Sequence, residues 1–201
     1  MPDGVYLVGY ADDVAAVITA RDLDAARRKF TQTMTKIKTW LDSQDLSLAP
    51  EKTELILFTR ARIPVEVTMP VYTQNKTTSK VVKYLGIKPD HKLTYWAQIQ
   101  YAAQKSTKTI SRLSRLMANI GGPIASRRKP LTDTMVPFLL YGCEVWADTL
   151  KTECSRKILS KAQRTAALRV ASAYRTLSEA AVLIISGTIP IDLLARERKE
   201  L

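Results

Sequence analysis

The chain has 201 residues, of which 46% are hydrophobic and 25% are charged, the composition of an ordinary globular protein. Its 31 Lys and Arg residues outnumber 19 Asp and Glu residues, and the formal net charge of +12 favours a polyanionic partner such as nucleic acid. Two cysteines and one histidine are too few for a structural zinc site or a disulfide framework. No signal peptide or membrane span is visible, so we expect an intracellular protein, in the nucleus or the cytoplasm, with no membrane role.

The charge is distributed unevenly along the chain. Residues 1–50 hold 6 basic and 7 acidic side chains, whereas residues 51–201 hold 25 basic and 12 acidic ones. An acidic first quarter followed by a basic remainder suits a metal-binding centre joined to a surface that binds a polyanion.

A pair of adjacent carboxylates, Asp12 and Asp13, lies between two apolar, β-branched runs within residues 5–19. This pattern predicts two strands joined by a tight hairpin turn. Alternation along a strand would place Tyr10 and Asp12 on one face and Asp13 on the other, unless the turn rotates Asp13. Two interpretations are open: the carboxylates are solvated turn residues, or they hold Mg²⁺, a hard cation that binds carboxylate oxygens.

The first half of the chain alternates between helical and extended patterns. Asp22 can cap an amphipathic helix that reaches about Leu41, and the apolar runs 54–59 and 81–87 predict strands. The prolines and polar tract of residues 60–80 predict short strands and loops rather than core.

The second half is predicted to be helical. We expect a helix from Tyr95 to the stop at 121–123, a helix over 127–150 bent at Pro137, a helix over about 155–175, a segment from Ser178 to near Gly187, and a solvated charged tail over 196–200. The fold class is therefore α+β, with one domain over residues 1–92 and an all-helical domain over 93–201.

Basic side chains recur at helical spacing on two of these segments. The first set is Lys105, Lys108, Arg112 and Arg115, and the second is Lys157, Lys161 and Arg164. Such faces are either solvated helix surfaces or sites for phosphates, and the overall positive charge supports binding, which would weaken steeply as salt rises.

The segment Tyr10-Ala11-Asp12-Asp13 resembles the Tyr/Phe-x-Asp-Asp signature of reverse transcriptases. Residues 48–54 and 83–87 look like the next two motifs of that family, a lysine-bearing loop and the hairpin that grips the primer end. Residues 138–146, with 173–176, are similar to the region after the polymerase core in non-LTR (LINE-type) retrotransposons. The resemblance implies part of a polymerase palm, an antiparallel sheet with a covering helix, followed by a thumb.

The resemblance also implies a chemistry, RNA-directed DNA polymerisation by two-metal nucleotidyl transfer. Asp12 would be the main ligand of Mg²⁺, with Mn²⁺ as a possible substitute, and Asp13 a weaker one. Lys52 would lie near the triphosphate, either neutralising it or donating a proton, unless it is a solvated loop lysine.

An RNA template and a DNA primer are the partners that the family implies. Tyr10 and the segment Tyr84-Leu85-Gly86 would approach the primer, although Tyr84-Leu85-Gly86 could equally be an ordinary core strand. The first basic set, Lys105 to Arg115, would follow the phosphates of the template–primer duplex as a thumb does.

The sequence departs from the family pattern, which requires a further aspartate upstream of the hairpin and fingers that bind the nucleotide. We therefore expect a fragment that uses deoxynucleoside triphosphates only together with a missing N-terminal half. The alternative is a non-catalytic, basic nucleic-acid-binding remnant of such an element. The sequence does not indicate an oligomeric state.

Overall fold

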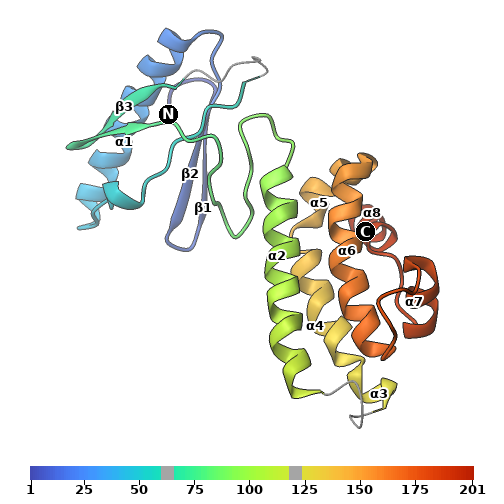
Figure 1. The fold of residues 1–201 in the computed structure, drawn as a ribbon. Coiled ribbons are helices and arrows are strands. Elements are labelled where there is room, and N and C mark those ends of the chain that lie inside the picture. The colour runs from blue at the N-terminus through green and yellow to red at the C-terminus, as the bar shows by residue number, and fades with distance from the viewer. Residues whose placement is uncertain (60–65, 118–123) are drawn as a thin grey trace. The chain divides into compact units, whose positions relative to one another are not determined.

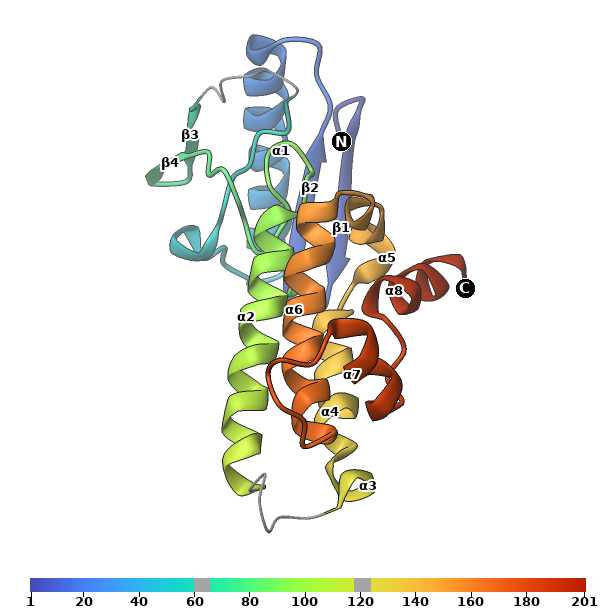
Figure 2. The same ribbon diagram turned by 45° about the vertical axis from the view of Figure 1, so that its right-hand side comes forward.

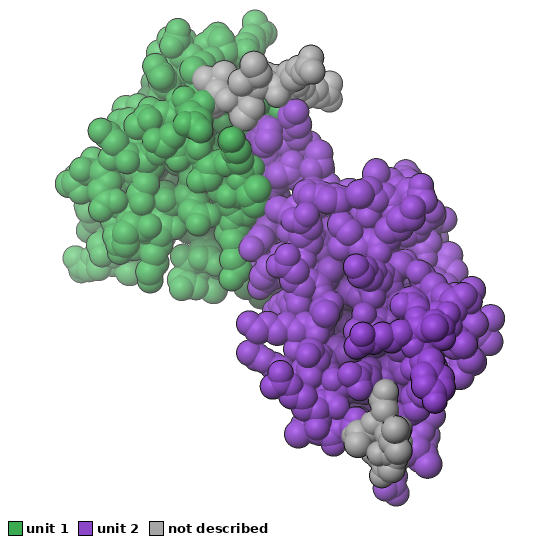
Figure 3. All heavy atoms as spheres, in the orientation of Figure 1, with its two compact units in different colours: residues 1–85 green, residues 86–201 purple. Residues whose placement is uncertain are grey.

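The computed structural model describes residues 1–59, 66–117 and 124–201. The chain divides into two compact units, residues 1–85 and 86–201 (Figure 3). Both small antiparallel sheets belong to unit 1, whereas unit 2 is built from helices, so the protein is α+β as predicted (Figure 1). The assignment of residues 1–92 to a palm and 93–201 to a thumb stays a prediction. None of the described helices is long and apolar enough to cross a bilayer.

Unit 1 begins with the expected hairpin. Strand β1 (Val5–Tyr10) pairs antiparallel with β2 (Asp13–Ile18), with Val5 opposite Ile18 at the open end and Tyr10 opposite Asp13 at the turn. Val5 is the one buried residue of these two strands, and several large apolar side chains along them are exposed. The apolar runs therefore specify strands through their β-branched and aromatic content rather than through burial.

Helix α1 (Leu23–Ser43) follows the hairpin and confirms the predicted amphipathic helix. The Asp22 carboxylate caps it by accepting a hydrogen bond from the Ala25 N–H at 2.7 Å. The helix buries Phe30, which packs in one cluster with Val67, Met69 and Val71. This cluster is the core of unit 1.

That core corrects two predictions about the middle of the chain. Residues 60–80 were expected outside the core, but Val67, Met69 and Val71 are buried at the hairpin of β3 (Thr68–Val71) and β4 (Gln74–Thr77). Residues 60–65 lie outside the described residues. The predicted strand over 54–59 is wrong. Ile56 makes an isolated parallel bridge to Ser79, and the pairing does not extend beyond this bridge. A short apolar run does not specify pairing unless a second strand lies beside it.

The predicted strand over residues 81–87 is also wrong. Leu85 and Gly86 have φ angles of 46° and 84°, so the chain turns there instead of extending. Glycine is required at residue 86 in this structure, because a Cβ atom would lie 2.9 Å from Cε1 of Tyr141.

Unit 2 is a bundle in which α2, α4 and α6 pack against one another (Figure 2). Its elements are α2 (Trp96–Leu113), η2 (Ser114–Leu116), α3 (Ala125–Arg128), α4 (Pro130–Leu139), α5 (Cys143–Trp146), η3 (Ala147–Lys151), α6 (Glu153–Val170), α7 (Glu179–Ser186) and α8 (Ile191–Glu200). Helix α6 ends five residues before the predicted boundary at 175, and α7 matches the prediction, with Ser178 as its N-cap and Gly187 as its C-cap.

The single bent helix expected over 127–150 is instead several short helices. Pro137 stays inside α4, while the break follows at Gly142, whose φ of 62° ends the helical path. A Cβ at Gly142 would lie 2.5 Å from Cδ1 of Ile87, so the position accepts only glycine without rearrangement. The turn places Trp146 in the core, where it is fully buried and donates from Nε1 to the Tyr141 carbonyl at 3.0 Å. Cys143 is buried beside it and Cys154 is exposed, and both are free thiols.

The charged tail over 196–200 is exposed to solvent, as expected, and it forms the last turns of helix α8. Gln163, buried in α6, donates from Nε2 to the Ile189 carbonyl and accepts the Ile191 N–H at 2.9 Å. The side chain of Gln163 thereby caps α8, whose Ile191 and Ala195 are buried in the core. Lys199 adds an ion pair to Asp148, and the pKa of Asp148 is lowered by its hydrogen bonds to Lys199 and Lys151.

The start of α2 depends on a buried carboxylate, Asp90. Its Oδ1 accepts the Tyr95 N–H at 2.5 Å, and its Oδ2 accepts from the Thr94 hydroxyl at 3.0 Å and the Lys92 N–H at 3.3 Å. These bonds hold Leu93 and Tyr95 at positive φ values of 55° and 54°, where non-glycine residues are uncommon. Asp90 thus compensates a strained turn.

We expect Asp90→Ala to destabilise unit 2 by about 2 kcal/mol, because it leaves partly buried N–H groups without an acceptor at a strained turn. Chemical denaturation followed by circular dichroism measures the loss. Lys92→Ala, in the same loop, is the control, because it keeps the backbone N–H and should change stability by less than about 0.5 kcal/mol. Equal stability of the two variants would show that Asp90 does not hold the turn.

Candidate functional site

The carboxylate pair lies at the tip of the β1–β2 hairpin. Ala11 and Asp12 form the turn, and Asp13 is the first residue of β2, directly opposite Tyr10. Directly opposite residues of an antiparallel pair share a face, so Tyr10 and Asp13 lie together. The turn therefore brings Asp13 to the face of Tyr10, and strand alternation does not apply to Asp12, which belongs to the turn.

The turn itself is strained. Ala11 has a φ of 53°, in the left-handed region that two-residue hairpin turns usually fill with Gly, Asn or Asp. A non-glycine residue there costs on the order of 1 kcal/mol. The two carboxylates come directly after this strained position.

Both carboxylates are exposed, and neither has a hydrogen bond or an ion pair with another described residue. Their oxygens are the donors that Mg²⁺ prefers, and that ion usually takes one or two carboxylates and fills its remaining positions with water and phosphate oxygens. The donor set therefore fits a divalent cation in part. Across residues 1–59, 66–117 and 124–201 no group of three or more potential metal ligands occurs, so this pair alone does not enclose an ion.

The other predicted site residues of unit 1 lie on elements other than the hairpin that carries Asp12 and Asp13, apart from Tyr10 at the end of β1. Lys52 is exposed at the end of the short helix η1 (Pro50–Lys52), and no contact with either aspartate is found. Tyr10 is 67% exposed. Tyr84 is half-buried, and its hydroxyl is buried without a hydrogen-bond partner among the described residues. The roles of Lys52, Tyr84 and Leu85 stay predictions.

Gly86, the first residue of unit 2, makes a close approach, as expected of a glycine in this segment, but it approaches Tyr141 of the same unit. The space beside its Cα is therefore filled by an aromatic ring in this structure. A role of Gly86 at a primer end also stays a prediction.

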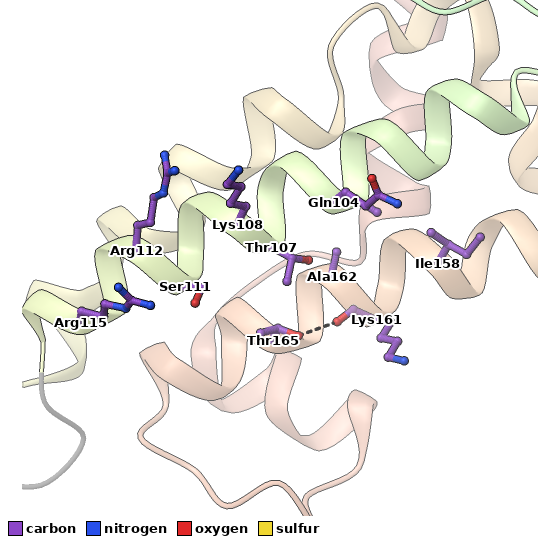
Figure 4. A pocket seen from close by; sticks show the side chains of 11 residues that line it. Gln104, Thr107, Lys108, Ser111, Arg112, Arg115, Ile158, Lys161, Ala162 and Thr165 are labelled. Atoms are coloured by element: carbon purple, nitrogen blue, oxygen red, sulfur yellow. Dashed lines mark hydrogen bonds between the residues drawn. The ribbon is translucent and has the colours of Figure 1, made fainter. Parts of the chain in front are cut away.

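Unit 2 contains a groove of about 900 Å³ between α2 and α6, which we call the α2–α6 groove (Figure 4). Its lining residues are Ala103, Gln104, Thr107, Lys108, Ser111, Arg112, Arg115, Ile158, Lys161, Ala162 and Thr165. The floor is made of small side chains, and cationic side chains stand along its edges. No Asp or Glu lines it.

The structure separates one member of the predicted basic face from the others. Lys108, Arg112 and Arg115 line the groove, whereas Lys105 does not. The ammonium of Lys105 lies 4.7 Å from the centre of the Phe138 ring, a cation–π contact with α4. Periodicity alone could not find this difference, because it depends on the aromatic residue that α4 brings to that point.

The second basic set is divided in the same way. Lys161 lines the groove from α6. Lys157 pairs with Glu153 at 2.7 Å, and Arg164 donates to the carbonyls of Arg175 and Leu177 at 2.6 and 2.7 Å. Arg164 therefore fixes the loop before α7, and Lys161 is the member of this set that faces the groove.

Sequence reasoning missed the polar, uncharged lining of the groove. Gln104, Thr107 and Ser111 recur at spacings of three and four on α2, and Thr165 lies on α6. The same spacing that identified the basic face would have identified this row.

Comparison with known proteins identifies relatives of the whole chain. It is 28% identical over 193 residues, or 94% of the chain, to a 115 kDa protein of the type-1 retrotransposable element R1DM from Drosophila melanogaster. It is 26% identical over 97% of the chain to a retrovirus-related Pol polyprotein of the type-1 retrotransposable element R1 2 from Nasonia vitripennis. It is 24% identical over 77% of the chain to a Drosophila melanogaster protein named as an RNA-directed DNA polymerase from transposon BS. No family model and no solved structure matches the chain.

The chain is a relative of the Pol proteins of non-LTR retrotransposons. The alignment to the Nasonia vitripennis Pol polyprotein includes 97% of the chain, so the similarity extends over both Asp12 and Asp13 and the α2–α6 groove. The chain spans only part of the length of these three relatives: 19%, 49% and 17% respectively.

Proposed function

We propose that the chain supplies the metal-binding hairpin and a nucleic-acid-binding surface of a non-LTR reverse transcriptase. The observation that carries the proposal is the pair Asp12 and Asp13 at the tip of a strained two-residue hairpin, in a relative of Pol proteins. A relative named as an RNA-directed DNA polymerase supports the same reaction class.

In this proposal Asp12 and Asp13 hold Mg²⁺, which supplies Lewis-acid activation of a primer hydroxyl and neutralises the triphosphate. Adjacent carboxylates repel each other, and a bound divalent cation offsets that repulsion. Cation binding therefore gives a reason for two adjacent negative charges in the turn region. Tyr10, opposite Asp13, presents an exposed ring on the same face of the hairpin and is placed to contact the primer end. Lys52 is proposed to neutralise the triphosphate.

Nucleotidyl transfer needs a third carboxylate, and the described residues place none beside Asp12 and Asp13. We therefore propose that catalysis requires a further segment that carries this acid and the nucleotide-binding fingers. RNA template, DNA primer and deoxynucleoside triphosphates are the proposed partners of the assembled enzyme, and the chain by itself is inactive.

A second candidate is non-catalytic nucleic-acid binding. The observation that favours it is the α2–α6 groove, with cationic side chains from both helices and no acidic lining. Phosphate contacts of this kind need no metal and no third carboxylate.

Metal binding at the hairpin can be tested on the chain itself. We expect Mn²⁺, used as a paramagnetic probe, to broaden the amide NMR signals of residues 11–14 before others, because both carboxylates lie there. Asp12→Asn combined with Asp13→Asn should abolish the broadening. Asp45→Asn, which removes an exposed acid outside the hairpin, should leave it unchanged. Broadening that survives the double substitution would rule out the hairpin as the metal site.

Catalysis is tested by adding, in trans, a segment of a related Pol protein that carries the fingers and the third carboxylate. We expect Mg²⁺-dependent extension of a DNA primer on an RNA template, and Asp12→Asn should abolish it, because the substitution removes a charged oxygen ligand. Primer extension by the Asp12→Asn chain would contradict the assignment.

Duplex binding is the third measurement. Replacing Lys108, Arg112 and Arg115 together with serine should weaken binding to a template–primer duplex. The slope of log K against log salt should become shallower by about 3, because each lost phosphate contact removes about 0.9. The matched control replaces Lys92, Lys151 and Lys157 with serine. This variant loses the same net charge, but none of the three lysines lines the groove. Equal losses in the two triple variants would indicate general attraction rather than a site.

A further inference from the structure

We infer that the α2–α6 groove binds an RNA strand through its ribose–phosphate backbone, and that Thr107 and Ser111 recognise the ribose 2′-hydroxyl. The inference rests on the proposed nucleic-acid binding and adds the type of strand and the residues that distinguish it. It concerns unit 2 alone.

The dimensions of the groove fit a short stretch of one strand. Its wall on α2 and the following turn η2 runs from Ala103 to Arg115, a rise of about 18 Å at roughly 1.5 Å per residue. That length corresponds to roughly five stacked nucleotides at 3.4 Å each. The small floor, with Ala103 and Ala162, lets a backbone come close to the helices.

The edges of the groove provide charge for phosphates. Lys108 and Arg112 point to the same side of α2 in Figure 4, and Lys161 extends from α6 at the other edge. None of these three cations has an acidic partner within the described part of the chain, in contrast to Lys157, which pairs with Glu153. Their charge is therefore available to a polyanion.

The floor provides a hydroxyl that the helix does not use. Threonine hydroxyls in the described α-helices usually donate to the backbone carbonyl four residues earlier, as Thr109 does to Lys105 and Thr165 does to Lys161. Thr132 donates to the carbonyl three residues earlier. Thr107 is the exception among the threonines of the described α-helices, and its hydroxyl has no hydrogen bond to a described residue. The hydroxyl of Ser111, one turn further along the floor, is also without such a bond.

A ribose 2′-hydroxyl is the complement of these groups. It is both donor and acceptor, as each serine and threonine hydroxyl is, and it is the group that distinguishes RNA from DNA. Serine and threonine hydroxyls also contact phosphate oxygens, but only as donors, whereas a 2′-hydroxyl can in turn donate to them. A DNA strand on the same floor would leave both hydroxyls facing a carbon-bound hydrogen, which lowers its affinity.

The test compares 12-nucleotide RNA and DNA strands of the same adenine and cytosine sequence, by fluorescence anisotropy at low salt. We expect the chain to prefer RNA by roughly fivefold, the effect of about one net hydrogen bond. Thr107→Val with Ser111→Ala should reduce RNA affinity to that of DNA and leave DNA affinity unchanged. An RNA with 2′-O-methyl groups should bind like DNA.

Two further variants separate this inference from the proposed function. Thr109→Val, which removes a hydroxyl on α2 outside the groove, should keep the RNA preference. Lys161→Ser should weaken the binding of RNA and of DNA equally and reduce the salt slope by about 0.7, the value of one phosphate contact to a single strand.

Equal binding of RNA and DNA, or a preference for RNA that survives the Thr107 and Ser111 changes, would overturn the inference while leaving salt-dependent binding intact. Unchanged binding by the Lys161→Ser variant and by the triple variant of Lys108, Arg112 and Arg115 would instead overturn the α2–α6 groove as the nucleic-acid-binding surface.

Discussion

The close packing of α2 against α6 is the interaction on which unit 2 depends. Ala103 on α2 and Ala162 and Ala166 on α6 are buried where the two helices meet. Small side chains let two helices approach closely, and bulky residues such as Ile99 and Leu159 belong to the same buried cluster. Ala103 and Ala162 also line the groove, so the packing of the two helices and the groove share these two residues.

The carboxylate hairpin shows a different relation between stability and function. Its turn keeps Ala11 in an unfavourable conformation and holds two negative charges on neighbouring residues, and no described basic side chain compensates them. Most of the large apolar side chains around it are exposed, so local packing offsets little of this cost. Such an arrangement is stabilised when a cation binds, which links the energetics of the turn to the chemistry proposed for it.

Much of the architecture could be predicted from the sequence, and the failures have physical reasons. Helix α1 and the start of α7 were predictable because their caps, Asp22 and Ser178, are local signals that stand next to regular apolar spacing. The runs 54–59 and 81–87 were misassigned because strand formation depends on a partner strand and on backbone angles at Leu85 and Gly86 that apolar content does not report. In the candidate sites, the doublet and the basic spacing were visible. The engagement of Lys105 by Phe138, and of Arg164 by two carbonyls, was not, because those partners come from distant parts of the chain.

The amide of Gln163 has a practical consequence for the boundaries of unit 2. One side chain inside α6 binds the backbone on both sides of Pro190, at Ile189 and Ile191. Shortening the protein before residue 189 would strand a polar amide within an apolar interior and uncover the hydrophobic residues that α8 protects. The last thirteen residues are thus integral to the folded domain, and limited proteolysis should spare them for as long as α6 remains in place.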